Sequence, residues 1–277
     1  MAQNSKIQWC HHTANLWWGC VSVHIGCLNC YAETLSKRFG DDVWGNDKPR
    51  REIKSVWNDL LRYQRLAKEA NEIHRVFVGS MMDIFEKPMP LIDKNKLYKE
   101  GVDTGWLRDL LFQQISAGLY PNLMFLFLTK RPSNINKYIP EDWKISPPKN
   151  VMFGTSPVNQ ETANKLIPQL LKVNGKLFLS IEPMLDSVDL TSIQGTDIFK
   201  SLYQVLQPIT NCGDSNRPAI SWVICGGESG GHKRPFNADW ARKLRDDCKK
   251  YHVPFFMKQI DKVQPIPSDL QIEEFYK

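Results

Sequence analysis

The chain has 277 residues, of which 42% are hydrophobic and 24% are charged. This composition is typical of a soluble globular protein, and it excludes fibrous and intrinsically disordered chains. Basic residues outnumber acidic residues by 36 to 30, and the resulting net charge of +6 is a mild excess compatible with an anionic ligand such as a nucleotide.

Neither a membrane span nor a secretion signal is expected. The longest apolar run covers residues 123–128, far short of the roughly 18 residues that suggest a membrane helix. The N-terminus lacks an apolar stretch between a basic start and a small-residue cleavage site. We therefore expect a cytoplasmic protein with no membrane partner, whose seven cysteines are buried thiols or metal ligands rather than disulfides.

A first strand is predicted near residues 16–23, and from residue 75 onward short apolar runs alternate with helical patterns. Nearly continuous hydrophobicity over each run indicates strands that are buried on both faces of a parallel sheet. The six runs cover residues 75–80, 123–129, 151–155, 176–181, 221–225 and 253–257. Three- and four-residue apolar spacing predicts helices over residues 31–39, 52–70, 104–118, 160–173 and 238–250.

This alternation predicts an α/β fold, a parallel TIM-like barrel, partial or complete, with about six to seven strands. No internal repeat or low-complexity tract divides the chain, so we expect a single domain over residues 1–277. Two segments rich in Pro, Asn, Asp and Gly, residues 41–51 and 207–218, are predicted surface loops.

Polar residues follow the predicted strands, and in a parallel barrel these positions open on one face. They are Ser80 to Asp83, Thr129 to Arg131, Thr155 and Ser156, Ser180 to Glu182, Gly226 to Gly230, and Lys258 with Gln259. Any one of them is compatible with a solvated strand end. Together, their charges favour a binding site.

The most specific motif is Cys20-x6-Cys27-x2-Cys30. Thiolates are soft ligands for zinc or iron–sulfur clusters, and a two-residue gap lets two sulfur atoms reach one metal centre. A zinc site needs a fourth ligand, for which the candidates are His24, His11, His12 and Cys10, and three unliganded thiols are the other alternative. We expect Cys10, Cys212, Cys225 and Cys248 not to bind the metal, since they lie alone, and Cys225 and Cys248 occupy apolar patterns where a thiol acts as a small hydrophobe.

A cysteine loop after the first strand of an α/β barrel resembles the radical SAM superfamily, although its usual spacing is C-x3-C-x2-C. Nearly the whole chain is similar to a largely uncharacterised family of phage and prophage proteins with radical SAM character. The matching segments are residues 5–7, 19–20, 26–32, 77–83, 128–132, 154–156, 180–183, 222–230 and 255–259. The chain departs from that family at residues 10–12 and 16–18.

The resemblance implies a radical SAM-type barrel with a 4Fe-4S cluster on Cys20, Cys27 and Cys30, whose open iron binds S-adenosylmethionine. Reductive cleavage to methionine and a 5′-deoxyadenosyl radical then requires an external one-electron donor. The residues expected to bind S-adenosylmethionine are Tyr31, Ser80, Asp83, Thr155, Glu182, Gly226, Gly227 and Glu228. Those expected to bind the substrate are Lys130, Arg131, Ser229 and Lys258.

Individual side chains suit these roles. Gly226 and Gly227 allow close backbone approach, and Glu228 can accept from an ammonium or ribose hydroxyl, although a plain tight turn is the alternative. Lys130 and Arg131 suit a carboxylate or phosphate, and solvated surface charges are the alternative.

We thus expect a radical SAM enzyme that modifies or repairs a nucleoside, nucleotide or DNA base, for example in phage DNA hypermodification. The phage setting of the similar family and the basic residues favour this substrate class; Lys233 and Arg234 belong to the same basic set. The alternatives are a zinc-stabilised nucleic-acid-binding protein without catalysis, and a radical SAM enzyme that acts on a peptide or small metabolite.

Overall fold

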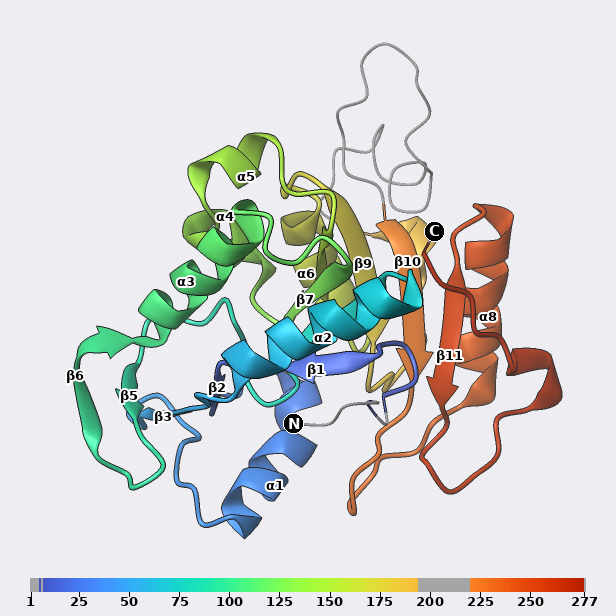
Figure 1. The fold of residues 1–277 in the computed structure, drawn as a ribbon. Coiled ribbons are helices and arrows are strands. Elements are labelled where there is room, and N and C mark those ends of the chain that lie inside the picture. Colours follow the sequence, from blue (N-terminus) through green and yellow to red (C-terminus); the bar gives the residue numbers. More distant parts are fainter. Residues whose placement is uncertain (1–4, 6, 194–219, 277) are drawn as a thin grey trace. The chain divides into compact units, whose positions relative to one another are not determined.

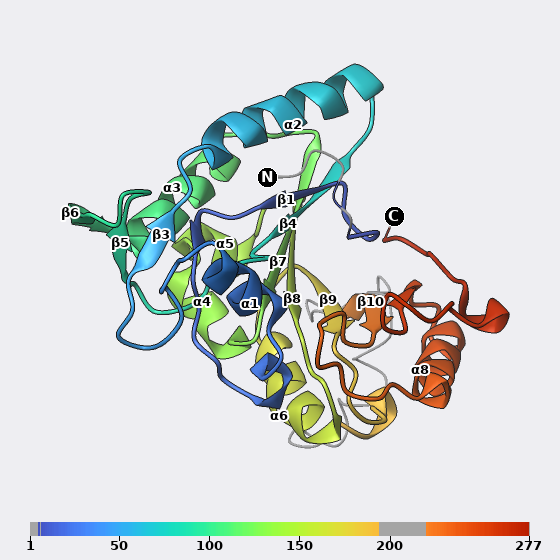
Figure 2. The same cartoon turned by 90° about the horizontal axis from the view of Figure 1, so that it is seen from below.

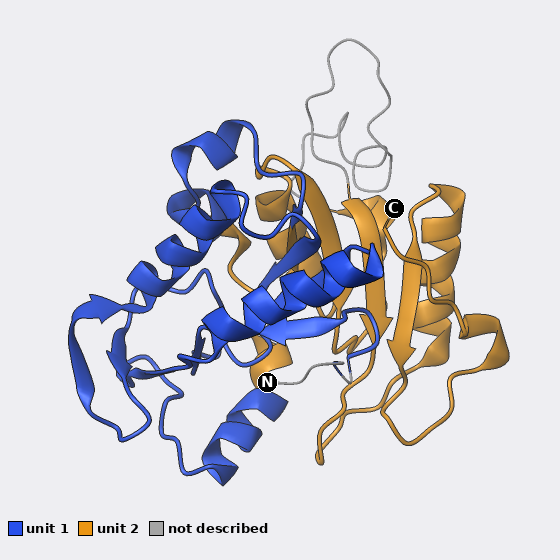
Figure 3. Ribbon diagram, in the orientation of Figure 1, with its two compact units in different colours: residues 1–23, 30–129, 134–151 blue, residues 24–29, 130–133, 152–277 orange. Residues whose placement is uncertain are grey.

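A computed structural model describes residues 5, 7–193 and 220–276 (Figure 1). Cys212 and the loop expected at residues 207–218 lie outside the described residues. The chain forms two units that interleave in sequence (Figure 3). Unit 1 comprises residues 1–23, 30–129 and 134–151, and unit 2 comprises residues 24–29, 130–133 and 152–277. The single domain expected from the sequence stays a prediction.

Three parallel strands form the sheet core of unit 1, in the order β1, β4, β7. They are β1 (His12–Ala14), β4 (His74–Val78) and β7 (Leu123–Thr129). Helix α2 (Val56–Ala70) packs on all three (Figure 2). Its buried residues Val56, Leu60, Tyr63 and Ala67 recur every three to four positions, so they line one face of the helix.

A second, smaller sheet in unit 1 has the strand order β2, β3, β5, β6. Its strands are β2 (Trp17–Trp18), β3 (Arg50–Glu52), β5 (Pro90–Ile92) and β6 (Tyr98–Asp103). The other helices of unit 1 are α1 (Tyr31–Arg38), α3 (Thr104–Ser116), α4 (Ile135–Tyr138) and α5 (Glu141–Ile145).

Four parallel strands form unit 2 in the order β8, β9, β10, β11. They are β8 (Val151–Thr155, in unit 2 from Met152 onward), β9 (Lys176–Ile181), β10 (Ile220–Gly226) and β11 (Phe255–Gln259). Helix α8 (Ala238–Lys250) packs on β10 and β11, and α6 (Gln160–Leu170) connects β8 to β9. The short 3₁₀ helices are η1 (Ile25–Cys27), η2 (Pro132–Asn134), η3 (Leu190–Ser192) and η4 (Ser268–Leu270).

The predicted α/β class with parallel strands is confirmed, and the parallel strands of the two units number seven. Strands β7, β8 and β9 have the predicted bounds, whereas the first strand was wrongly placed. The parallel strand is β1, and residues 17–18 belong to the smaller sheet, where β2 runs antiparallel to β3. Among the described helices, none is both long and apolar enough to cross a membrane.

Candidate functional site

The three cysteines of the motif differ in exposure from the other described cysteines. Cys20, Cys27 and Cys30 are each partly exposed, whereas Cys10, Cys225 and Cys248 are buried. Burial raises the pKa of the Cys225 and Cys248 thiols, so these two remain protonated and apolar, as their sequence patterns indicated.

Each motif cysteine lies at, or close to, the end of a helix or strand. Cys20 comes two residues after β2, Cys27 ends η1, and Cys30 is the N-cap residue of α1. Cys20 and Cys30 belong to unit 1, and Cys27 belongs to unit 2. Within the described ranges, no three His, Cys, Asp or Glu side chains form a group that could hold a metal ion.

In unit 1, the segment beside Cys20 is held by Arg50. The Gly45 N–H donates to the Cys20 carbonyl at 3.0 Å. Arg50 Nη1 in turn donates to three carbonyls of the same segment, those of Val43, Gly45 and Lys48, at 2.9, 3.2 and 2.8 Å. One guanidinium therefore fixes the backbone that contacts Cys20.

Arg50 is itself held by a buried carboxylate. Its Nε and Nη2 donate to the two oxygens of Glu86 at 2.8 and 2.9 Å, and the Trp17 indole donates to the same carboxylate at 3.1 Å. The side chains of Arg50 and Glu86 are 0% and 2% exposed. The prediction that residues 41–51 form a surface loop is therefore partly wrong: Val43 and Arg50 are buried, because Arg50 needs Glu86 as its partner.

Gly19 lies against this arrangement and needs to be glycine. Its φ is +121°, and a Cβ at this position would lie 2.4 Å from the Val43 carbonyl oxygen and 2.6 Å from Arg50 Cδ. Only glycine adopts this backbone conformation at no steric cost and leaves room for Arg50.

Three of the predicted cofactor residues lie in unit 1, Tyr31 at the start of α1 and Ser80 and Asp83 in the loop after β4. The Tyr31 hydroxyl donates to the Ser80 carbonyl at 2.8 Å, while the Ser80 hydroxyl accepts from the Asn15 amide at 2.8 Å. Asp83 is buried and accepts from the Thr129 hydroxyl at 2.7 and 2.9 Å. Asp83 thus links the end of β7 to the loop after β4.

In unit 2, the Cys27 segment is bound to the loop that follows β10. Asn29 Nδ2 donates to Glu228 Oε2 at 3.1 Å and to the His232 carbonyl at 2.7 Å. Arg234 Nη1 donates to the Ile25 carbonyl at 3.0 Å. Both sides of Cys27 are therefore held by the Gly226–Gly230 loop and the residues directly after it.

Glu228 is the centre of these contacts. Besides Asn29, it accepts from the Arg234 backbone N–H at 2.7 Å, from Arg234 Nε at 3.1 Å and from Arg234 Nη2. Burial raises the pKa of Glu228. The hydrogen bonds from Arg234 and Asn29 and the charge of Arg234 lower it by more, so the pKa of Glu228 lies below its ordinary value. Three of these donors share Oε2, and Arg234 Nη2 alone donates to Oε1, so most of the acceptor capacity of this carboxylate is used within unit 2.

The two glycines before Glu228 have different neighbours. A Cβ on Gly227 would lie 2.1 Å from the Ile260 carbonyl oxygen, and the Gly227 N–H donates to the Gln259 carbonyl at 3.1 Å. The backbone that approaches Gly227 closely is therefore the end of β11 and the residue after it. A Cβ on Gly226 would lie 3.5 Å from Lys258 Cβ.

An ion pair in unit 2 crosses β10. Glu182 follows β9 and Lys258 lies on β11, and the two side chains pair although β10 lies between their strands. Both are largely buried, with 18% and 11% of their side chains exposed. The hydroxyl of Ser180, two residues before Glu182, is buried and has no hydrogen-bond partner in the described structure.

The other predicted binding residues of unit 2 have varied surroundings. Thr155 ends β8 and is buried, while Ser229, Lys130 and Arg131 are partly exposed. Three of the basic residues that favoured an anionic substrate pair with acids: Lys258 with Glu182, Arg234 with Glu228, and Lys233 with Asp261. Their charges are thereby neutralised within unit 2.

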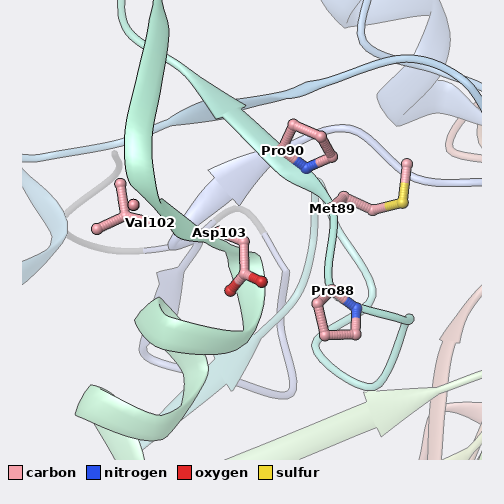
Figure 4. Close-up of a pocket in the computed structure, with 6 residues that line it drawn as sticks. Pro88, Met89, Pro90, Val102 and Asp103 are labelled. Atoms are coloured by element: carbon pink, nitrogen blue, oxygen red, sulfur yellow. The ribbon is translucent and has the colours of Figure 1, made fainter.

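A surface pocket of about 470 Å³ lies in unit 1 at the β5–β6 hairpin (Figure 4). It is lined by Pro88, Met89, Pro90, Gly101, Val102 and Asp103. The Asp103 carboxylate caps α3 by accepting from the Trp106 N–H at 2.9 Å. None of the predicted site residues lines this pocket.

Sequence reasoning missed the residues that hold the cysteine segments in place. Asn29 lies inside the motif and was treated as a spacer, and Arg234 was assigned to an anionic substrate. Arg50 and Glu86 were not singled out, since they are 36 residues apart in the sequence. An arginine in an otherwise polar loop gives no sequence signal of its buried partner.

The described residues thus define an α/β protein in which parallel strands end in polar loops, one of which binds a cysteine segment. A family model described as a protein of unknown function (DUF5131) matches residues 4–269, and the chain belongs to this family. Comparisons with curated proteins and with solved structures gave no match.

Proposed function

We propose that this protein is a radical SAM enzyme that modifies or repairs a nucleoside, nucleotide or DNA base, with Cys20, Cys27 and Cys30 as ligands of a 4Fe-4S cluster in a TIM-like barrel. When bound, the cluster supplies the electron that cleaves S-adenosylmethionine into methionine and a 5′-deoxyadenosyl radical.

One observation carries this proposal: the Cys27 segment is fixed to the loop after β10 by Asn29, Glu228 and Arg234. This loop begins where β10 ends, at the carboxyl end of the parallel strands. Parallel α/β proteins bind ligands and cofactors at that end of their strands. A cysteine segment held there is placed where this fold class carries out its chemistry.

The donor set fits the cluster in its chemistry. Cys20, Cys27 and Cys30 are partly exposed thiols, and thiolates are the usual ligands of iron–sulfur clusters. The segments beside Cys20 and Cys27 are each fixed by an arginine, so the chain spends little conformational entropy in presenting these two sulfur atoms to a metal.

In this proposal the neighbouring residues have distinct tasks. Tyr31 is held through its hydroxyl, and this residue, which is 46% exposed, would contribute an aromatic ring for stacking on a base. Glu182, Lys258 and Ser180 supply polar groups at the ends of β9 and β11 for the cofactor or substrate. Glu228 acts as a positioning residue for the Cys27 segment, because it accepts from Asn29 and from Arg234, which donates to the Ile25 carbonyl.

The test is anaerobic reconstitution with iron and sulfide, followed by measurement of iron per chain and of 5′-deoxyadenosine formed from S-adenosylmethionine under a chemical reductant. We expect the wild-type chain to bind iron and to form 5′-deoxyadenosine. Cys27→Ala should lose both, whereas the matched control Cys248→Ala, which alters a buried thiol, should keep its iron. Circular dichroism of both variants checks that they fold.

Unchanged iron in Cys27→Ala, or lost iron in a folded Cys248→Ala, would refute the cluster assignment. A colourless chain that retains zinc and binds nucleic acid would favour the zinc-stabilised binding protein. If 5′-deoxyadenosine forms, a screen of nucleosides, nucleotides, DNA, peptides and small metabolites identifies the substrate class.

A further inference from the structure

His24 presents a buried hydrogen-bond donor that nothing described in the structure accepts. It is the N-cap of η1, where its Nδ1 accepts from the Gly26 N–H at 3.0 Å. In a neutral imidazole, one nitrogen accepts and the other carries the hydrogen, so Nε2 is the donor. This Nε2 is buried and has no hydrogen-bond partner among the described residues.

The surroundings of His24 are cationic. Burial and then the charges of Lys130, Lys165 and Arg131 lower its pKa to about 4. Since Nδ1 accepts a hydrogen bond, the ring is neutral in the structure. Lys130 and Arg131 come directly after β7, and Lys165 lies on α6, where it is exposed.

Residues 24–29 and 130–133 belong to the same compact unit as α6, and the cysteine segment packs on the start of this helix. A Cβ on Gly26 would lie 2.6 Å from Val158 Cγ1, and Val158 is the second residue before α6. Lys165 is in no ion pair within the described part of the chain. This contrasts with Lys233, Arg234 and Lys258, each of which is paired with an acid.

We propose that His24, Lys130, Arg131 and Lys165 bind the phosphate group of the substrate. This inference rests on the proposed function and narrows its substrate class to a phosphorylated one, a nucleotide rather than a free nucleoside. A phosphate oxygen would accept from His24 Nε2, and three cations suit a dianion better than a carboxylate. The same charges disfavour a dication such as zinc at His24.

The first test measures binding to the chain as purified, without iron, by isothermal titration calorimetry at low salt. The probes are inorganic phosphate, a deoxynucleoside monophosphate and the corresponding deoxynucleoside. We expect inorganic phosphate and the deoxynucleoside monophosphate to bind and the deoxynucleoside not to bind. If the monophosphate binds more tightly than inorganic phosphate, the phosphate group recognised by the site belongs to a nucleotide. Lys165→Glu should weaken both by roughly tenfold or more, a change of about 1.4 kcal/mol per factor of ten.

The matched control is Lys249→Glu, an exposed lysine in the last turn of α8. Helix α8 leads into β11, so its last turn lies at the opposite end of the strands from the loop after β10. This variant changes the net charge equally and should keep wild-type affinity. Equal weakening in both variants, or no phosphate binding by the wild type, would overturn the proposal.

His24→Asn isolates the imidazole. Asparagine is a good N-cap and can still accept from the Gly26 N–H, but it lacks the Nε2 donor. We expect this variant to fold and to bind phosphate several-fold more weakly, and unchanged affinity would remove His24 from the site. Because no arm involves iron, failure here is distinguishable from failure of the cluster assignment.

Discussion

Arg50 forms a bidentate ion pair with Glu86, and Arg234 forms one with Glu228. Each arginine also donates to the backbone of a segment near a motif cysteine. Unit 1 buries its pair completely, whereas in unit 2 the Arg234 side chain is 26% exposed. The two units thus use the same chemistry at different depths. A fully buried pair makes a segment part of the core, and a pair whose arginine is partly exposed holds a segment closer to the surface, where a ligand can reach it.

The largest effect is expected from breaking the buried pair. Arg50→Ala leaves Glu86 as an uncompensated buried charge and removes the donors to Val43, Gly45 and Lys48, so it should lower the free energy of unfolding by about 3 to 5 kcal/mol. Urea denaturation measures this loss. The control is Arg242→Ala, which breaks exposed pairs with Asp269 and Asp239 and should cost far less, because exposed ion pairs contribute little to stability. A similar decrease in the free energy of unfolding in both variants would show that burial of the ion pair does not determine its contribution to stability.

Acid should weaken unit 1 before it affects the Glu228 pair. His12 is buried, stacks on Tyr63 and shares a 3.0 Å hydrogen bond with His74. Its pKa falls to about 4, first through burial and then through His74, His11 and Arg62. The unfolded chain therefore binds more protons between pH 6.5 and 4, and stability is lost as the pH falls through this window. Glu228, with a lowered pKa, loses its contribution only at more acidic pH.

Protonation of His12 should lower the free energy of unfolding by roughly 3 kcal/mol at most, at about 1.4 kcal/mol per unit of pKa difference between the folded and unfolded chain. His24 in unit 2 titrates over the same window, so the readout must be local: hydrogen exchange of the β1 and β4 amides between pH 7 and 4. His12→Phe keeps a ring beside Tyr63 and should make the loss of protection shallower. His252→Asn, at an exposed histidine, is the control, and an unchanged slope in His12→Phe would refute the assignment.

Removing the partly exposed Arg234–Glu228 pair should cost less and act locally. Glu228→Ala leaves Asn29 and Arg234 without their acceptor and should lower the free energy of unfolding by about 1 to 3 kcal/mol. Hydrogen exchange of residues 24–29 should accelerate in this variant. Lys233→Gln is the control, since the Lys233–Asp261 pair does not contact that segment. Unchanged protection of residues 24–29 in Glu228→Ala would show that Glu228 does not hold them.

The smallest effect on stability is expected at Gly226, two residues before Glu228. Gly226→Ala adds a methyl group at ordinary contact distance from Lys258, so it should change the free energy of unfolding by less than about 1 kcal/mol. Gly227→Ala instead forces a Cβ against the Ile260 carbonyl and should cost about 1 to 3 kcal/mol. Thermal denaturation of the two variants compares them, and equal costs would show that the close approach at Gly227 can relax.

The sequence predicted the parallel strands well, because strands buried on both faces are marked by continuous apolar runs. The runs at 123–129, 151–155 and 176–181 match β7, β8 and β9. Strand β1 escaped notice because its first residue is a histidine whose burial depends on His74 and Tyr63. The β5–β6 hairpin was also missed, since β6 is largely exposed and lacks an apolar pattern.

The candidate site was predictable in part. The close spacing of the three motif cysteines in the sequence set them apart from Cys225 and Cys248. The latter two have apolar neighbours in the sequence, which indicate burial, and both are buried in the structure. The partners of charged residues could not be predicted in the same way. Glu228 and Asn29 are 199 residues apart, so only the folded chain reveals that this carboxylate binds the cysteine motif.

The interleaving of the two units has a consequence for dissection of the chain by truncation. Residues 24–29 belong to unit 2 but are covalently joined at both ends to unit 1. A fragment that begins at residue 152 would keep Glu228 and Arg234 but would lack Asn29 and Ile25, which they bind. A single cut in the chain therefore cannot yield unit 2 together with Cys27. A minimal form of unit 2 would need residues 24–29 supplied as a separate peptide or joined by a new linker.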